Sequence, residues 1–319
     1  LREAGINCKI LILGFTSSTR ISDAVTYGID LAVYDVETAK LLSDEAVKQH
    51  KTANVHIKLD TGMGRLGFSC KDGEATLSVE EIVEISKLPN ICMYGVFSHF
   101  AVADDNDDDY TRLQFNTFMN QIDLLKGSGV TFVKRHICNS AGIMRFPEFH
   151  LDMVRAGIIL YGLMPPGCPE PATKINLIPV MTWYAKVIHQ KMIPEGTSVS
   201  YGRHFKAGEP TRVLTISVGY ADGLSRRVGN GSYELLLGDQ RLPIIGNVCM
   251  DMCMIDITDM PEVEVGSEIE IFGNNNSINT LAEIAGTIPY ELTCAVSKRV
   301  PRSYIKDGKI TGKELLLRM

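Results

Sequence analysis

The sequence lacks the features that would place it in a membrane or on a nucleic acid. No stretch of its 319 residues approaches the run of about 18 apolar residues that a membrane-spanning helix needs. No basic run or stripe stands out, and the formal net charge is -6, which argues against nucleic acid as the main partner. The opening LREAGINCKILILG has no long apolar core of a signal peptide. We expect it to form the end of a helix that leads into a strand.

Metal-site patterns are also missing. The chain has eight cysteines, but the closest pair, Cys249 and Cys253, has no second pair or histidine at zinc spacing. We expect no bound metal there, and reduced, buried thiols of a cytosolic protein rather than disulfides. The acidic run ADDNDDDY, residues 103–110, lacks the glycine and the terminal glutamate of an EF-hand loop. It favours a solvated loop or a helix cap.

What is present is an ordinary globular composition with alternating element patterns. Hydrophobic residues make up 45% and charged residues 22% of the chain, and the length favours two domains or one large barrel with an appendage. Short β-rich runs alternate with longer helical patterns in the first half. The expected strands lie within residues 9–14, 31–35, 54–60, 95–101, 132–140 and 153–162. Strands that alternate with helices predict parallel β/α units.

Polar residues at the ends of these expected strands favour an α/β fold of the (β/α)8 barrel type. They are Arg65, His99, His136, Ser140 and Arg155, and in such a barrel the strand ends converge on the catalytic face. A doubly wound sheet would normally carry a glycine-rich nucleotide turn after a strand, and none is seen. Six expected strands do not close a barrel, and the sequence opens inside a helix.

The character of the sequence changes after Pro165 and Pro166. From about residue 178 onward, short β-rich segments are separated by turn signals, with a short helix expected near residues 280–285. We therefore expect a β/α barrel domain over residues 1–177 and a mainly β domain over residues 178–319.

Residue chemistry alone points to an anionic ligand at the strand ends. Two arginines and two histidines among these ends suit charge-assisted hydrogen bonds. The segment HICNSAG, residues 136–142, places a serine and small residues at a strand-to-helix turn, where backbone N–H groups and a hydroxyl can hold phosphate. A phosphate-bearing cofactor is a reasonable hypothesis. Structural ion pairing remains the alternative for each charged residue, and Tyr201 can equally be an ordinary amphipathic tyrosine.

The chain also carries an ordered series of recognisable segments. They are HIKLDTGMGRLGF, SHFAVAD, HICNSAG, RAGIILYG, VSYGRHF, SVGYADG, GNVCMDM and KRVPR. In this order, from Leu1 to about Arg302, they resemble the motifs of the bacterial alanine racemase family of fold type III pyridoxal-phosphate enzymes. The resemblance implies an isomerase that interconverts L- and D-alanine by a two-base mechanism and supplies D-alanine for peptidoglycan. It also implies pyridoxal 5'-phosphate as cofactor, a small amino acid as substrate, a cytoplasmic location and a homodimer with shared active sites.

The resemblance assigns catalytic roles residue by residue. Tyr201 would act as base on one face of the substrate, reaching into the barrel of the partner subunit. An unperturbed tyrosine is a poor base at neutral pH, so Arg155 and His99 would form its electrostatic surroundings. Arg155 would also donate a hydrogen bond to the pyridine nitrogen of the cofactor. Because arginine stays protonated, that nitrogen would stay unprotonated, which favours racemisation over transamination.

Binding roles follow in the same way. Arg65 would bond the phenolic oxygen of the cofactor and approach the substrate carboxylate, with His136 supporting the arginines. Lys58 matches a position that is carbamylated in many members, and a carbamate would orient Arg65. The cofactor phosphate would be held by Ser140, Gly157 and Ile158, with Asn139 beside them. The substrate carboxylate would be bound by the Met250 N–H, with Asp251 adjacent, both from the partner subunit.

Two departures from the family pattern qualify these expectations. The family's cofactor lysine, which holds the Schiff base and serves as second base, is not present in this sequence. It should lie before Leu1, and we expect two β/α units, about 60 residues, to be absent. The tyrosine found at the phosphate in some members corresponds to Lys298.

Other activities stay open at this point. One is a serine racemase of the vancomycin-resistance type, in which this chain would be the cytoplasmic domain of a membrane-anchored protein. Fold type III decarboxylases and a non-catalytic cofactor-binding protein are further alternatives.

Overall fold

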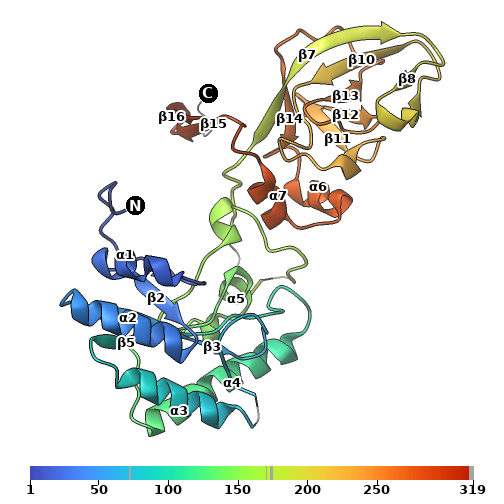
Figure 1. The fold of residues 1–319 in the computed structure, drawn as a ribbon. Coiled ribbons are helices and arrows are strands. Elements are labelled where there is room, and N and C mark those ends of the chain that lie inside the picture. The colour runs from blue at the N-terminus through green and yellow to red at the C-terminus, as the bar shows by residue number, and fades with distance from the viewer. Residues whose placement is uncertain (72, 170, 173–174, 316–319) are drawn as a thin grey trace. The chain divides into compact units, whose positions relative to one another are not determined.

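The computed structural model describes residues 1–71, 73–169, 171–172 and 175–315. The chain forms two compact units (Figure 1). The first comprises Leu1–Leu160 with Gly167–Asn176, and the second comprises Tyr161–Pro166 with Leu177–Met319.

The first unit is built around a parallel sheet, as the alternating pattern predicts. Its strands lie in the order β1, β2, β3, β5, β6, and β4 pairs with β3. Within the described residues this sheet is open, a partial barrel rather than a closed one. The strands are β1 Leu11–Ile12, β2 Asp30–Val33, β3 Ala53–Asp60, β4 Phe68–Ser69, β5 Ile91–Phe97 and β6 Lys134–His136.

Helices follow these strands along the chain. Neighbours α1, α2, α3 and α4 pack side by side (Figure 1). The α-helices are α1 Ile21–Thr26, α2 Val36–Lys48, α3 Ala75–Ser86, α4 Asp108–Gly127 and α5 Ser140–Arg145, and the 3-10 helices are η1 Ser18–Arg20, η2 Pro147–Phe149 and η3 Ile158–Tyr161.

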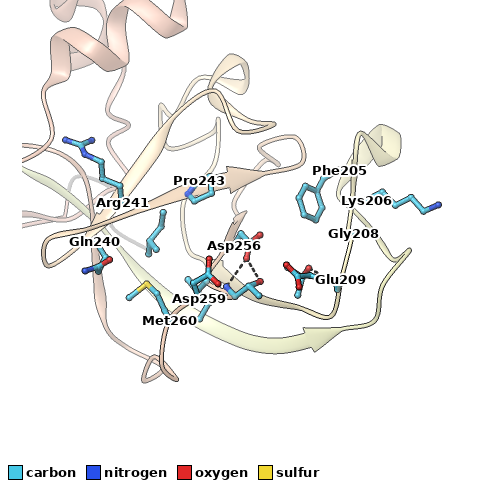
Figure 2. A pocket seen from close by; sticks show the side chains of 14 residues that line it. Phe205, Lys206, Gly208, Glu209, Gln240, Arg241, Pro243, Asp256, Asp259 and Met260 are labelled. Atoms are coloured by element: carbon cyan, nitrogen blue, oxygen red, sulfur yellow. Dashed lines mark hydrogen bonds between the residues drawn. The ribbon is translucent and has the colours of Figure 1, made fainter.

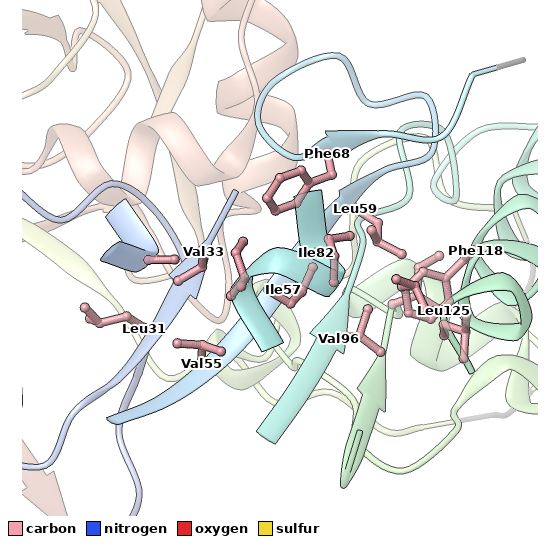
Figure 3. Packing of buried hydrophobic residues seen from close by; sticks show 14 of the residues in the cluster. Leu31, Val33, Val55, Ile57, Leu59, Phe68, Ile82, Val96, Phe118 and Leu125 are labelled. Carbon is pink, nitrogen blue, oxygen red and sulfur yellow. The ribbon is translucent and has the colours of Figure 1, made fainter. Parts of the chain in front are cut away.

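The central strand β3 is buried on both faces. Val55, Ile57 and Leu59 are fully buried and pack with residues such as Ile82 and Val96 (Figure 3). The opposite face of the strand carries His56 and Lys58, which are only 2% and 4% exposed. Rings of β5 and β6 pack against this face, because His56 contacts the rings of Tyr94 and His136 and Lys58 Nζ stands 5.4 Å from the centroid of Phe97. The polar alternation of β3 therefore does not reach solvent. These two polar side chains must therefore find partners inside the unit.

The strand expected over residues 153–162 is wrong. Two backbone hydrogen bonds follow the edge of β6, from Asp152 N to Arg135 O and from Arg155 N to Cys138 O. Beyond them the Gly157 N–H donates to the Ser140 hydroxyl oxygen, and the Gly157 carbonyl accepts from Leu160 N. Because these groups are engaged locally, the chain turns into η3 instead of extending the sheet.

The second unit contains a closed antiparallel barrel, ordered β10, β13, β12, β11, β14, β7. This confirms the mainly β character expected after residue 178. The barrel strands are β7 Trp183–Ile193, β10 Thr211–Ile216, β11 Glu234–Leu237, β12 Gln240–Ile245, β13 Cys253–Asp256 and β14 Glu268–Phe272. The inner residues alternate along β7, where Trp183, Ala185 and Val187 are buried and the residues between them are exposed.

Shorter elements complete the second unit. The helix expected near residues 280–285 is confirmed as α6 Ile278–Ala285. The others are β8 Ser198–Val199, η4 Tyr201–Arg203, β9 Phe205–Lys206, η5 Arg226–Val228, α7 Pro289–Ala295, β15 Arg302–Lys306 and β16 Lys309–Glu314.

The cysteines and the acidic run can be located in this fold. All eight thiols are free, and three of them are buried and three half-buried. Cys8 and Cys294 are exposed, so the expectation of burial is wrong for these two. The acidic run caps a helix as expected, because the Asp107 carboxylate accepts from Tyr110 N at the start of α4. Within the described part of the chain, no cluster of histidine, cysteine and carboxylate residues could hold a metal ion. Among the helices that the structure describes, none has the length and apolarity to cross a membrane.

Candidate active site

Arg155 is the centre of the polar cluster at the ends of β5 and β6. Its Nη2 donates to the carbonyl oxygens of Ser98 at 2.7 Å and Ile137 at 2.9 Å. Nη1 lies 2.7 Å from His136 Nδ1, and Nη2 lies 3.2 Å from His99 Nδ1. Burial lowers the pKa of Arg155 to about 10, so the group is still a cation at neutral pH. Within the described residues Nη2 faces three acceptors with its two N–H groups, whereas Nε–H and the second N–H of Nη1 are left for a further acceptor.

The two histidines beside Arg155 are neutral. Burial, followed by the charge of Arg155, lowers the pKa of His99 to about 3 and that of His136 to about 2. The His136 ring stacks on Phe97, with centroids 4.9 Å apart. Because a guanidinium can only donate, both Nδ1 atoms must accept from it. The arrangement is a fixed cation held by neutral acceptors.

Lys58 lies deeper in the same unit. Its Nζ donates to Leu59 O at 2.8 Å and stands 5.4 Å from the centroid of Phe97. Burial lowers its pKa to about 8, and the charges of Arg155 and Arg65 act in the same direction. A buried amine among arginines is therefore deprotonated far more readily than a surface lysine.

Arg65 is exposed on the loop between β3 and β4. Asp60 holds this loop, because its carboxylate accepts from Gly62 N and Gly64 N, each at 3.0 Å from Oδ1. The loop passes so close to β3 that a Cβ on Gly67 would stand 2.6 Å from Asp60 N. The glycines thus set the path of the loop, and Arg65 extends from it near enough to lower the pKa of Lys58 and His99.

Ser140 and Gly157 come together from successive loops, as the strand-end pattern predicts. The Ser140 hydroxyl oxygen accepts from Gly157 N at 2.9 Å, which leaves its own proton to donate. Asn139 caps α5 by accepting from Gly142 N, and Ile158 is buried at the start of η3. A Cβ on Gly157 would stand 3.4 Å from the Ser140 hydroxyl oxygen. This donor set fits an anionic oxygen group such as phosphate.

In the second unit, Tyr201 opens η4 and its side chain is 69% exposed. The preceding Ser200 has φ 68°, a conformation uncommon outside glycine. Asn247 holds this turn: its Nδ2 donates to Tyr201 O at 2.6 Å, and its carbonyl accepts from the Ser200 hydroxyl at 2.6 Å. The Tyr201 backbone is thereby fixed while its phenol is free to enter another surface.

Met250 and Asp251 lie on a neighbouring loop of the same unit. The Met250 carbonyl accepts from Ala221 N, and Asp251 accepts from Arg299 Nη2 at 2.5 Å. Arg299 also donates from Nε to Asp222 at 2.7 Å. Arg299 therefore joins the loop of Met250 to the segment around Asp222.

Four side chains in or next to the predicted site were not expected from the sequence: Arg299, Asp222, His56, which contacts His136, and Asp30, which contacts His56. Arg299 and Asp222 lie inside the segments KRVPR and SVGYADG, but nothing in those segments pairs them. His56 lies on the same strand face as Lys58, and this alternation is the signal that could have singled it out. Asp30 begins β2 and carries no such signal.

A polar hollow of about 760 Å³ lies elsewhere on the second unit (Figure 2). Lys206, Glu209, Arg241 and Asp256 are among its lining residues, and none of the predicted site residues lines it. The Asp256 carboxylate accepts from Thr258 N at 2.9 Å. Its mixed charges and open shape do not match the chemistry of the predicted site.

Comparison with known proteins identifies the family. The alanine racemase N-terminal domain model matches residues 1–165, and the alanine racemase C-terminal domain model matches residues 180–304. The chain belongs to the alanine racemase family. This confirms the resemblance carried by the ordered motifs and the fold expected from it.

Relatives across this family are similar over most of their length. The alanine racemase of Clostridium tetani is 45% identical over 98% of this chain and 80% of its own length. That of Methanococcus maripaludis is 42% identical over 96% of the chain and 81% of its own length. The solved alanine racemase of Clostridium difficile 630 has a TM-score of 0.93 at 35% identity, covering 99% of this chain and 81% of that one. A Bacillus anthracis alanine racemase with bound L-Ala-P has a TM-score of 0.85 at 33% identity, covering 98% and 80%.

Proposed function

We propose that this protein interconverts L- and D-alanine with pyridoxal 5'-phosphate bound in the first unit. The observation that carries the proposal is Arg155, a buried cation held by His136, His99 and two carbonyl oxygens. Curated alanine racemases at 40–45% identity support the same activity. The product D-alanine would serve peptidoglycan synthesis in the cytoplasm.

The residues of the first unit fit this cofactor. Pyridoxal phosphate, when bound, supplies a conjugated ring that withdraws electrons from the α-carbon of an attached amino acid. Arg155 would donate to the ring nitrogen and keep it unprotonated, because arginine does not give up its proton. Arg155 would thereby limit the electron withdrawal that the cofactor supplies and favour return of the proton to the α-carbon. The phosphate would be held by the Ser140 hydroxyl proton and the Ile158 N–H, with Asn139 beside them. The Gly157 N–H, which donates to the Ser140 oxygen in this structure, would share its proton with the phosphate.

Tyr201 would move the α-proton on one face of the substrate. A phenol of ordinary pKa, about 10, needs nearby cations or hydrogen bonds to act as a base at neutral pH. We propose that Arg155 and His99 of a partner subunit provide these surroundings in a head-to-tail homodimer. Arg65 and the Met250 N–H, with Asp251 adjacent, would bind the substrate carboxylate.

Lys58 would act as a carbamate. Its amine has a pKa of about 8 because of burial, so about a tenth of it is neutral at pH 7 and can add carbon dioxide. The product is an anion beside Arg65 and Arg155, which lowers the cost of burying these cations. We expect ¹³C-bicarbonate to give a carbamate carbon signal in the wild type. Lys58→Met should lack that signal, whereas the exposed-lysine variant Lys48→Met should retain it. A wild type without the signal would contradict this role.

The activity is tested with purified full-length protein and added pyridoxal 5'-phosphate. We expect L-alanine to be converted to an equal mixture of the enantiomers, because these have the same free energy in water. L-Serine serves as the competitor, and its kcat/KM should be lower than that of L-alanine. One added hydroxyl can change the binding free energy of the transition state by only a few kcal/mol. A protein that shows the visible absorption of bound cofactor but forms no D-alanine would overturn the proposal. A higher kcat/KM for L-serine would replace alanine as the substrate.

A further inference from the structure

Behind Arg155 lies a line of buried polar side chains from three strands. His136 Nε2 of β6 is 2.9 Å from His56 Nδ1 of β3. His56 Nε2 is in turn 3.7 Å from Asp30 Oδ2 of β2. His136, His56 and Asp30 are 0%, 2% and 5% exposed. The line connects a carboxylate on one side of the sheet to the guanidinium of Arg155 on the other.

Hydrogen-bond chemistry allows only one placement of the protons along this line. Arg155 donates to His136 Nδ1, so the single ring proton of His136 must be on Nε2. His136 Nε2–H then donates to His56 Nδ1, which places the proton of His56 on Nε2, facing Asp30. The opposite tautomer of His56 would set two N–H groups against each other. Both imidazoles are therefore neutral, with their protons directed away from Arg155.

Asp30 is held so that it remains an acceptor. Asn54 Nδ2 donates to Asp30 Oδ1 at 3.0 Å, and Lys9 Nζ stands 3.6 Å from Asp30 Oδ2. Burial raises the pKa of Asp30, but the hydrogen bonds from His56 and Asn54 and the charge of Lys9 outweigh it and lower that pKa. The carboxylate thus stays ionised, and at 3.7 Å from His56 Nε2 it favours the His56 tautomer whose N–H points towards it.

The surrounding strands are shaped to accept this line. A Cβ on Gly95 would stand 2.5 Å from Cε1 of the His56 ring. The imidazole therefore fits against β5 only because residue 95 has no side chain. Phe97, two residues along β5, stacks on His136 with an interplanar angle of 5°. Ring positions are therefore set by packing, and proton positions by Arg155 at one end of the line and Asp30 at the other.

We propose that Asp30 is a positioning residue for Arg155, acting through fixed tautomers of His56 and His136. Without the carboxylate, His56 can place its proton on Nδ1 and stop accepting from His136. His136 can then shift its own proton to Nδ1, where it repels the guanidinium. The consequence for catalysis rests on the proposed function, in which Arg155 contacts the cofactor ring. The tautomers themselves do not depend on that function.

The first test is ¹⁵N NMR of histidine-labelled protein without cofactor, between about pH 5 and 8. We expect His56 and His136 as neutral Nε2–H tautomers in the wild type. A wild-type His136 with its proton on Nδ1 would overturn the proposal, and this measurement needs no variant to fold. His150, whose ring nitrogen Nε2 contacts Ile143 O, is the reference signal.

The second test changes Asp30. Asp30→Leu should give mixed tautomers at His56 and His136 and leave the His150 signals in place. It should also lower the affinity for pyridoxal phosphate and kcat, each by about tenfold. The KM for alanine should change little. Asp30→Asn should restore most of both, because the amide oxygen still accepts from His56. If Asp30→Leu does not fold, His56→Gln is the second variant. The Gln amide oxygen can accept from His136 without Asp30, so the NMR signals of His136 should still show the Nε2–H tautomer.

The outcomes separate this proposal from the proposed function. If Asp30→Leu keeps the wild-type tautomers and the wild-type protein racemises alanine, the role of Asp30 is overturned and the proposed function stands. Asp30-dependent tautomers in a protein that racemises nothing would uphold the relay and remove the proposed function. A tautomer on Nδ1 at His136 in His56→Gln would also count against the relay.

Discussion

At Arg155 one guanidinium serves four acceptors in fixed directions. A lysine has a single nitrogen on a flexible stem and cannot reproduce this fork. Arg155→Lys should therefore lose at least two charge-assisted hydrogen bonds, together about 3 kcal/mol or about 100-fold in kcat/KM. Steady-state kinetics with L-alanine measures this loss.

A matched control exists on the same unit. Arg135 pairs with Asp152 on the surface, at 2.8 Å, and Arg135→Lys should keep kcat/KM within about twofold, as expected for an exposed ion pair. Equal losses in both variants would show that Arg155 has no special part in catalysis.

The buried histidines make the free energy of unfolding depend on pH below about 6.5. The pKa values of His99 and His136 are about 3 and about 2 in the folded protein, against about 6.5 when unfolded. Below pH 6.5 the unfolded chain binds protons that the folded one does not. The free energy of unfolding should fall as pH drops from 6.5 to 4.5, by about 1.4 kcal/mol per pH unit for each histidine. Above pH 7 neither histidine contributes a slope.

Urea unfolding of variants at several pH values checks this dependence. His136→Asn should be less stable at pH 7 but should lose about 1.4 kcal/mol per pH unit of the slope. His50→Asn alters an exposed histidine at φ 52°, where asparagine is tolerated, and should keep the wild-type slope. A His136→Asn protein with that same slope would mean that His136 is not the neutral buried group described above.

Among the elements, β3 shows how far sequence patterns reach. Its alternation predicted the strand and the apolar face of Val55, Ile57 and Leu59. Burial of the other face depended on ring side chains of β5 and β6 that pack against His56 and Lys58. Residues 153–162 are similarly apolar but lead into η3. The Gly157 N–H donates to the Ser140 hydroxyl, and the Leu160 N–H donates to the Gly157 carbonyl within a local turn. Apolar content alone did not distinguish an edge segment from a strand.

Gly95 tests the packing of β5 against β3. Its Cβ position is occupied by the His56 ring, so Gly95→Ala should cost about 1–3 kcal/mol of unfolding free energy through overpacking. Chemical denaturation measures the loss. Gly127→Ala is the control, because nothing lies within 4 Å of a Cβ there, and at the end of α4 it should be neutral or slightly stabilising. A Gly95→Ala protein as stable as the control would refute the close approach.

For the whole molecule, the proposed head-to-tail dimer makes a quantitative prediction. Tyr201→Ala and Arg155→Ala proteins should each be inactive, since each lacks one part of the shared site. If they are unfolded together and refolded as an equal mixture, half the dimers contain one of each. One of the two sites in such a dimer is then intact, so activity should return to about one quarter of wild type. Mixtures that stay inactive, while native wild-type refolds, would exclude shared sites.

The sequence by itself determined the β/α alternation, the change of character near residue 178, the polar strand ends and the family. These depend on local periodicity, turn chemistry and short motifs, which are written along the chain. Only the tertiary structure decided which polar groups face each other. Parallel pairing of Leu31 with Val55 brings Asp30 beside Asn54 and His56, and β6 adds His136. Proton positions on a histidine depend on its partners, and partners distant in sequence are set by strand register rather than by composition.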